Sequence, residues 1–236
     1  MATQKERHLA LVLGATGGIG HALVEALVDR KMEWGIDDVI GLSRSSQPAF
    51  DLMNEASIAQ CAEWVQQQGR PHWVIDATGV LHFPGHQPEK ALSQIDPEHM
   101  LHSFAINAVG PALFMKHFLP LLPKSGPSVF ATLSAKVGSI EDNHLGGWYS
   151  YRASKAALNQ LVKTASIELK RRAPFAICVA LHPGTVDTGL STPYSKAGLN
   201  VRPPPVAAQD LLNVIAQLKP DHTGGFFDYQ GHVIPW

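Results

Sequence analysis

Short apolar segments alternate with longer segments of helical periodicity along most of this chain. The apolar segments cover residues 8–14, 38–43, 72–79, 128–134 and 175–184. The helical patterns lie at about 19–27, 55–67, 97–119, 152–171 and 206–218. The apolar segments do not alternate with polar residues, which is typical of parallel strands buried on both faces of a sheet. The sequence therefore predicts an α/β fold, in which helices flank a doubly wound parallel sheet.

Length and charge exclude several classes of protein. The 236 residues are enough for one large domain, and 19 basic side chains nearly balance 20 acidic ones. No run of like charges occurs, so we expect no nucleic-acid surface. The first apolar run is too short for a signal peptide, and no segment reaches the ~18 apolar residues of a membrane helix. Cys61 and Cys178 lie in apolar contexts, so we expect buried free thiols in a cytoplasmic protein that is not bound to a membrane.

One connection departs from the regular alternation. Residues 184–205 are rich in Pro, Gly, Ser and Thr, and the segment is long for a link between two elements. Long connections of this kind are commonly lids or binding loops. We find no composition break that marks a second domain. The sequence therefore predicts a single domain over residues 1–236 with a substrate loop at about 189–205.

A glycine-rich turn connects the first predicted strand to the first predicted helix. It reads Gly14-Ala15-Thr16-Gly17-Gly18-Ile19-Gly20, with the spacing GxxxGxG. Glycines allow the backbone to turn tightly and to approach a pyrophosphate, while the helix N-terminus supplies N–H donors and a positive dipole end. An ordinary tight turn would use the same residues. The strand-to-helix position favours a dinucleotide-binding loop.

The end of the second predicted strand distinguishes the two nicotinamide dinucleotides. A carboxylate there would hold a free ribose 2′-hydroxyl, but this chain has Ser43, Arg44 and Ser45. The planar guanidinium of Arg44 is suited to a 2′-phosphate, and Ser43 precedes it. A solvated loop arginine is the alternative. The sequence favours NADP(H) as cofactor, and NAD(H) is the second candidate.

Tyr151 precedes Lys155 by four residues within the pattern YSYRASKAAL. This spacing places two side chains on one face of a helix, whereas the six residues between Tyr149 and Lys155 do not. Carbonyl reduction needs a proton donor, and a tyrosine with a pKa near ~10 needs a neighbouring cation to work in both directions at neutral pH. Lys155 meets that requirement, although the same spacing also occurs on plain solvated helices.

Several motifs in a fixed order resemble those of the short-chain dehydrogenase/reductase family over nearly the whole chain. They are GxxxGIG at 14–20, the basic residue after the second strand, FDL at 50–52, ATG at 77–79, Asn107 in INAVG, Ser134, YRASK at 151–155 and PGTVDT at 183–188. The segment before YRASK and the C-terminal GGFFDYQGHVIPW are similar to the C-factor branch and its carbonyl-reductase relatives. The resemblance implies one Rossmann-like domain with a parallel sheet of about seven strands.

The resemblance also implies which residues hold the cofactor. Those expected at the pyrophosphate are Gly14, Thr16, Gly17, Gly18, Ile19 and Gly20. Asp51 and Leu52 are expected at the adenine, and Ala77, Thr78 and Gly79 at its ribose. Pro183, Gly184, Val186 and Thr188 are expected at the nicotinamide carboxamide. Asp51 is also placed to cap the helix predicted from about residue 54.

A catalytic group of four residues follows from the resemblance. Tyr151 is the acid/base, Lys155 lowers its pKa and holds the nicotinamide ribose, and Ser134 polarises the carbonyl. Asn107 interrupts a helix to hold a water that links Lys155 to solvent, although an asparagine at such a position can also be a helix cap. The family often has two serines where this chain has Ser134 and Ala135, so Ser139 is the alternative serine.

Two departures from the family pattern affect the cofactor site. The family commonly has NNAG where this chain has Asp76-Ala77-Thr78-Gly79, and a threonine where it has Leu13. The bonds that the second asparagine makes within the sheet are therefore in question. His144, Trp148 and Tyr149 are candidates for the wall of a substrate pocket or for loop packing.

The sequence predicts an NADP(H)-dependent oxidoreductase that transfers hydride between the nicotinamide and a ketone, aldehyde or secondary alcohol. Its partner is a small-molecule substrate, and family members commonly form homodimers or homotetramers. A short-chain epimerase or dehydratase would usually carry further C-terminal residues. A C-factor-like signalling or cofactor-sensing protein is the alternative from another class, although a sensor does not need Tyr151 and Lys155 together. The twelve histidines are scattered, and we expect no metal site.

Overall fold

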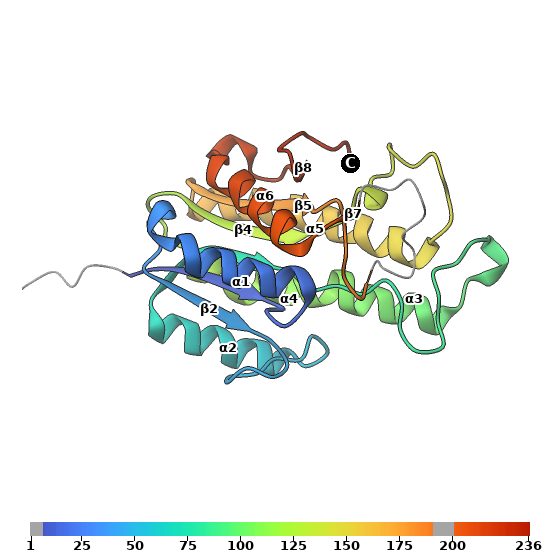
Figure 1. The fold of residues 1–236 in the computed structure, drawn as a ribbon, viewed down its shortest axis with the longest axis horizontal. Helices are drawn as coiled ribbons and strands as arrows, with labels where there is room; N and C mark the ends of the chain where they lie inside the picture. Colours follow the sequence, from blue (N-terminus) through green and yellow to red (C-terminus); the bar gives the residue numbers. More distant parts are fainter. Residues whose placement is uncertain (1–6, 191–200) are drawn as a thin grey trace, which may run out of the picture.

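A six-stranded parallel sheet forms the centre of the protein. We describe residues 7–190 and 201–236 of a computed structural model (Figure 1). Within these residues the sheet has the order β2-β1-β3-β4-β5-β8, and every neighbouring pair is parallel. The strands are β1 (His8–Leu13), β2 (Asp38–Leu42), β3 (Arg70–Asp76), β4 (Ser128–Leu133), β5 (Ala176–His182) and β8 (Phe226–Asp228). The predicted doubly wound α/β fold is confirmed, with six strands in this sheet where about seven were expected.

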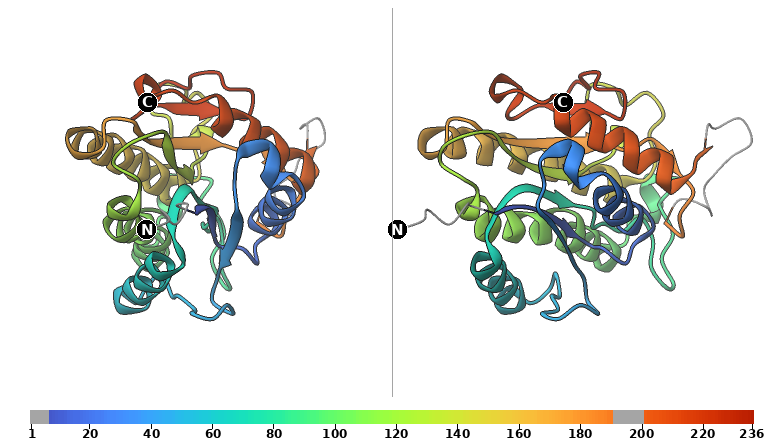
Figure 2. Two further views of the ribbon diagram at one scale, coloured as in Figure 1. Left: turned by 90° about the vertical axis from the view of Figure 1, so that its left-hand side faces the viewer. Right: turned by 60° about the vertical axis from the view of Figure 1, so that its left-hand side comes forward.

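Helices cover both faces of the sheet, which gives three layers (Figure 2). On one face lie α1 (Gly18–Arg30) and α6 (Pro204–Gln217); on the other lie α2 (Glu55–Gln68), α4 (Gly110–Phe118) and α5 (Tyr149–Arg172). The central strand β1 shows why these strands are apolar throughout. Leu11 and Leu13 pack into the α2/α4/α5 side of the core, whereas Ala10 and Val12 pack into the α1/α6 side. The side chains from Leu9 to Leu13 are all buried, so the polar alternation of a half-exposed strand is absent.

Helix α5 begins earlier than the sequence predicts. The apolar stripe indicates a helix from residue 152, but α5 starts at Tyr149 and includes both tyrosines. No side chain of its own caps the helix N-terminus, so the sequence carries no local start signal there. The short strands β8, β6 (Thr185–Val186) and β7 (Val201–Arg202) were also not predicted. Strands of two or three residues are too short to show a periodic pattern.

The helical run Pro97–Leu121 is long and apolar enough to cross a membrane by length and composition alone, contrary to our expectation from the sequence. It consists of α3 (Pro97–Phe104), a π-helical turn (Ala105–Val109), α4 and a short 3-10 turn. Phe114 and Phe118 of this run are fully buried in the core against the sheet and α5. Packing inside the protein therefore accounts for the apolar character of the run.

Two further predictions concern the cysteines and the long substrate loop. Cys61 and Cys178 are free thiols, and both are buried as predicted. Burial raises the pKa of Cys61 to about 11 and that of Cys178 to about 12. Most of the predicted substrate loop at 189–205 lies outside the described residues, which include only its two ends.

Candidate active site

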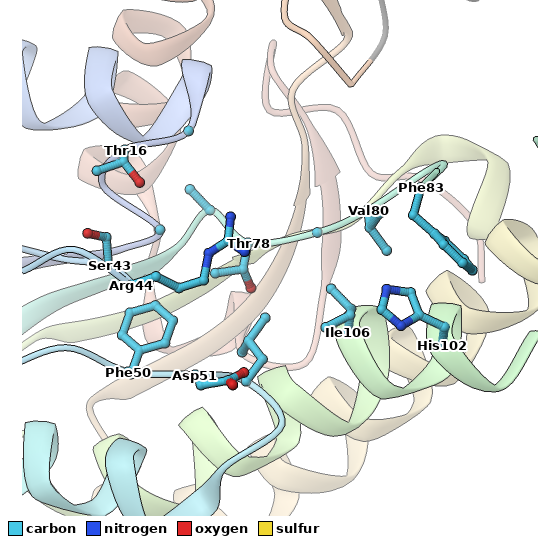
Figure 3. Close-up of a pocket in the computed structure, with 15 residues that line it drawn as sticks. Thr16, Ser43, Arg44, Phe50, Asp51, Thr78, Val80, Phe83, His102 and Ile106 are labelled. Atoms are coloured by element: carbon cyan, nitrogen blue, oxygen red, sulfur yellow. The ribbon is translucent and has the colours of Figure 1, made fainter. Parts of the chain in front are cut away.

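A cavity of about 400 Å³ opens at the carboxyl ends of β1, β2 and β3 (Figure 3). Its lining includes eleven residues assembled from four separate segments of the chain. They are Gly14, Thr16, Gly17, Ser43, Arg44, Phe50, Asp51, Leu52, Ala77, Thr78 and Gly79. Ligands of open α/β sheets bind at this edge, outside the carboxyl ends of the strands. The structure therefore brings together most of the residues that the sequence predicts for the adenosine and pyrophosphate.

The glycine loop leaves no room for side chains at two of its positions. A Cβ on Gly20 would lie 2.1 Å from the carbonyl oxygen of Gly14, and one on Gly18 would lie 2.7 Å from Cγ2 of Thr188. The absence of a side chain at Gly20 allows the turn into α1 to close. Its absence at Gly18 allows the loop to lie against the segment that follows β5. Ile19 packs instead into the core beneath α1. A compact backbone loop at a helix N-terminus fits the pyrophosphate of a dinucleotide.

Arg44 extends from the end of β2 into the cavity, between Thr16 and Asp51 (Figure 3). The residue is exposed, whereas the neighbouring Ser43 is buried and its hydroxyl accepts a hydrogen bond of 3.1 Å from the N–H of Ser45. Asn54 caps α2 with its own side chain. Asp51 therefore does not cap that helix, and its carboxylate accepts from the N–H of Met53 at 2.9 Å at the edge of the cavity.

The carboxylate of Asp76, which stands at the first asparagine of the family's NNAG, accepts three hydrogen bonds. One carboxylate oxygen accepts from the N–H and hydroxyl of Thr78 at 3.0 and 2.6 Å, and the other accepts from the hydroxyl of Thr132 at 2.7 Å. The turn after β3 is thus tied to β4. Asp76 is completely buried, and this burial raises its pKa.

The cavity continues beyond the predicted residues to Val80, Phe83, His102 and Ile106 (Figure 3). The rings of Phe83 and His102 lie 4.3 Å apart between centroids. Val80 directly follows the ATG motif, and that position could have identified it. Phe83 and His102 carry no comparable signal, because only the folding of the segment after β3 onto α3 brings them to the cavity.

A second, smaller cavity of about 170 Å³ lies at the ends of β4 and β5 and is partly walled by Tyr151. Tyr151 packs in an apolar cluster with Leu81 and Ala135, and it is 9% exposed. Trp148 also lines the cavity, and its ring meets that of Tyr151 edge to face at 6.2 Å. Of the other residues considered before Tyr151, His144 is exposed on the loop.

Lys155 is buried one helical turn beyond Tyr151. Its ammonium donates a hydrogen bond of 2.8 Å to the carbonyl oxygen of Leu133 at the end of β4. Burial lowers the pKa of Lys155 to about 8, while the charge of Asp76 acts in the opposite direction. Burial raises the pKa of Tyr151, which is contrary to the lowering expected from Lys155, because desolvation of the phenolate dominates in this structure.

Asn107 lies in the π-helical turn and is completely buried. Its amide oxygen accepts from the N–H of Val80, and its amide nitrogen donates to the carbonyl of Val80, each at 2.8 Å. The same nitrogen donates to the hydroxyl of Ser154 at 3.1 Å. The helix irregularity expected at Asn107 is therefore present, and the side chain joins the turn after β3 to α5. A π-helical turn inside an α-helix is frequently found at functional sites.

The two candidate serines have different surroundings. Ser134 lines the smaller cavity, and its hydroxyl donates to the amide oxygen of Asn159 at 2.7 Å. The hydroxyl of Ser139 accepts from the N–H of Asp142 at 3.1 Å. Ala135, which lies between the two serines in the sequence, packs with Tyr151. Of the two serines, Ser134 is the one that lines the smaller cavity.

The segment after β5 closes the smaller cavity. Its lining includes Pro183, Gly184, Val186 and Thr188, as well as His182, which the sequence did not single out. Arg202 fixes this turn, since its guanidinium donates to the carbonyl of Pro183 at 3.1 Å and pairs with Asp210. Burial lowers the pKa of His182 to about 4. Its position directly before PGTVDT is a signal that could have identified it.

The described residues contain no group of three or more His, Cys, Asp or Glu that could hold a metal ion. The neighbouring rings of Phe83, His86, His99 and His102 form an aromatic cluster.

Comparison with known proteins shows the family of the chain. Residues 8–198 match the family model for short chain dehydrogenases. The chain is 38% identical to the C-signal protein of Myxococcus xanthus over 146 residues, covering 62% of this chain and 84% of that one. It is 28% identical to 1-hydroxy-2-glutathionyl-2-methyl-3-butene dehydrogenase of Rhodococcus sp. (strain AD45) over 232 residues, covering 96% and 98%. The NADPH-bound carbonyl reductase from chicken fatty liver has the same fold, with a TM-score of 0.81 at 23% identity over 98% of this chain and all of that one. The chain therefore belongs to the short-chain dehydrogenase/reductase family of NAD(P)-dependent oxidoreductases.

Proposed function

We propose that this protein is an NADP(H)-dependent reductase of a small ketone or aldehyde, in which Tyr151 delivers the proton. The observation that carries the proposal is the position of Tyr151 and Lys155. Both extend from α5 to the sheet edge, where the larger cavity lies at the ends of β1, β2 and β3 and the smaller one at the ends of β4 and β5. The larger one accommodates the adenosine and pyrophosphate of the cofactor. The smaller one, whose wall includes Pro183 and Thr188, accommodates the nicotinamide and the carbonyl compound beside it.

The cofactor assignment follows from the end of β2. Arg44 and the Ser43 hydroxyl lie on the wall of the larger cavity, and a guanidinium is suited to a 2′-phosphate. The residues predicted at the pyrophosphate and ribose fit a dinucleotide, since the glycine loop leaves no space for side chains at Gly18 and Gly20. The chicken carbonyl reductase of the same fold is described with NADPH. NAD(H) is the second candidate cofactor, and the binding of both dinucleotides to Arg44→Ala distinguishes between the two.

The proton chemistry rests on this chain's own residues. The bound nicotinamide supplies the hydride for reduction. Tyr151 donates its phenolic proton to the carbonyl oxygen as the alkoxide forms. Lys155 has three N–H donors and gives one to Leu133, which leaves the others for the nicotinamide ribose. A charged Lys155 next to the bound cofactor favours the phenolate and so opposes the effect of burial on the pKa of Tyr151.

Ser134 and Asn107 complete the proposed group. Ser134 would polarise the substrate carbonyl by turning its hydroxyl from Asn159 toward the cavity. Asn107 holds the backbone at Val80 beside Gly79, where a Cβ would lie 3.4 Å from both the Asn107 oxygen and the Lys155 nitrogen. We propose that a water held beside Asn107 returns protons to Lys155.

The two ends of the segment 189–205 adjoin the smaller cavity, because Leu190 lines it and Arg202 supports its wall. We propose that this segment covers the substrate. We also propose a cytoplasmic location, in which Cys61 and Cys178 remain reduced, and a homodimer or homotetramer as the assembly.

The C-signal likeness favours a second function, in which the protein senses the cofactor or signals without turnover. A panel of ketones and aldehydes, followed by the loss of NADPH absorbance, separates the two. Turnover of at least one carbonyl class supports the reductase. Tight NADPH binding with no turnover across the panel would favour the sensor and refute the reductase.

A further inference from the structure

Glu89 is a buried carboxylate outside both cavities. It lies between β3 and α3, and only 1% of its side chain is exposed. A carboxylate is costly to remove from water unless hydrogen bonds and opposite partial charges compensate it. Neither the cofactor nor the proton transfer described above uses Glu89. The groups that bind this carboxylate therefore indicate its role.

Within residues 7–190 and 201–236, the polar partners of Glu89 belong to the start of α5 or to one histidine. Its two carboxylate oxygens accept from the N–H of Ser150 at 3.3 and 3.2 Å, and one of them also accepts from the Ser150 hydroxyl. Nδ1 of His99, in α3, lies 3.5 Å from the same carboxylate. The main-chain oxygen of Glu89 accepts from the N–H of Trp148 at 2.5 Å. Glu89 thus binds the helix start through both its side chain and its backbone.

Helix α5 needs such support because its own N-cap does not provide it. The N-cap residue is Trp148, which makes no side-chain capping bond and has φ 52 and ψ 44. A bulky residue in this left-handed conformation is strained and persists only where neighbouring structure holds it. Glu89 holds Trp148 by its backbone and satisfies a free N–H of the first turn by its carboxylate. Negative charge at this position also complements the helix dipole.

The residues held by Glu89 adjoin the reactive phenol. Ser150 directly precedes Tyr151, and Trp148 packs its ring against that of Tyr151 on the wall of the smaller cavity. A shift of the first turn of α5 would therefore move the phenol and one wall of the cavity together. Lys155 lies one turn further along and is anchored separately to Leu133.

We propose that Glu89 is a positioning residue for Tyr151, which caps α5 from another segment of the chain and sets where the phenol meets the substrate. This proposal rests on the proposed reductase function. It places the effect on proton delivery rather than on cofactor binding, because neither Glu89 nor its partners at the start of α5 line the larger cavity. His99 supports the carboxylate from α3 and is 2% exposed.

The test compares Glu89→Ala with the native protein, using a carbonyl substrate from the panel. The concentration of competent sites is taken from NADPH fluorescence titration, so that unfolded molecules do not count. We expect kcat per NADPH site to fall by about 10-fold or more, since small misplacements of a reacting group are costly. The Kd for NADPH should stay within about 2-fold, because the cavity proposed for its adenosine and pyrophosphate is lined by other residues. Glu89→Gln keeps one acceptor for the Ser150 N–H and should recover part of kcat.

Glu63→Ala is the matched control, because Glu63 is an exposed residue on α2. Native kcat per site in Glu89→Ala, or a loss of NADPH affinity as large as the loss of kcat, would overturn the proposal. Should Glu89→Ala not fold, Ser150→Ala and Glu89→Gln decide: reduced kcat at unchanged NADPH affinity supports it, and native kcat in both overturns it. If the native protein turns over no carbonyl, the reductase function fails and this proposal fails with it. If the native protein, Glu63→Ala and Glu89→Ala all reduce the carbonyl substrate with the same kcat per NADPH site, only the proposal for Glu89 fails.

Discussion

Asn107 and Val80 form a reciprocal pair, in which the side-chain amide of one binds both the N–H and the carbonyl of the other at 2.8 Å. The pair joins the π-helical turn to the loop that borders both proposed ligands. Because Asn107 is completely buried, nothing else replaces these bonds when its side chain is removed. The geometry of the loop at Gly79 and Val80 therefore depends on one side chain.

Asn107→Ala should lower the free energy of unfolding by about 2–3 kcal/mol, because two buried backbone groups of Val80 lose their partner. Urea denaturation at pH 7 measures the change. Gln160→Ala is a suitable control, since Gln160 is exposed on α5. A loss below about 0.5 kcal/mol for Asn107→Ala would show that the pair is not needed for stability.

Arg44→Ala should weaken NADPH binding by about 10-fold or more, because a charge-assisted bond to the 2′-phosphate is lost. NADH has no 2′-phosphate, so its Kd should change by less than about 2-fold. Fluorescence titration with both dinucleotides measures this difference. Arg171→Ala, an exposed residue at the end of α5, controls for the loss of one positive charge. Equal weakening of the two dinucleotides would refute the phosphate contact.

Asp76→Asn should move the alkaline limb of NADPH-dependent turnover to lower pH. Burial lowers the pKa of Lys155 to about 8, and the negative charge of Asp76 counteracts part of that effect. Without this charge the pKa falls further, so the ammonium is lost at a lower pH. The pH profile of kcat/KM reports the change, with Asp29→Asn as an exposed control. A limb that stays in place or moves upward contradicts the coupling.

His182 should make the protein less stable in mild acid. Its pKa is lowered from 6.5 to about 4 by burial, so between these values the unfolded chain binds a proton that the folded protein does not. Stability therefore falls as pH decreases through this range, by about 3 kcal/mol in all. His182→Asn should lose less stability than the native protein between pH 7 and pH 4.5 in urea denaturation. Parallel losses in both proteins would argue against a buried neutral His182.

The sequence predicted the fold and much of the site because both depend on local signals. Buried parallel strands are apolar throughout, as Leu9–Leu13 of β1 are, and the glycine loop follows such a strand. The carboxyl ends of neighbouring parallel strands share one edge, so Arg44, Thr78 and Ser134 could be placed at the same edge of the sheet from strand positions alone.

Contacts between distant segments could not be predicted in this way. Glu89 and Ser150 are 61 residues apart, and no periodicity connects them. The hydroxyl of Ser134 binds Asn159, a partner that depends on how α5 packs against β4. The burial of the phenol, which raises the pKa of Tyr151, is likewise a property of the packed structure that the spacing of Tyr151 and Lys155 does not show.

Tyr151→Phe tests the central claim most directly. The substitution removes only the phenolic hydroxyl, so the ring still packs with Leu81 and Ala135, and Lys155 keeps its bond to Leu133. NADPH affinity should remain within about 2-fold of native, while NADPH oxidation with the best carbonyl substrate should fall by about 100-fold or more. Tyr149→Phe is the matched control, and it should retain activity. Turnover by Tyr151→Phe at the native rate would contradict the assignment of Tyr151 as the proton donor.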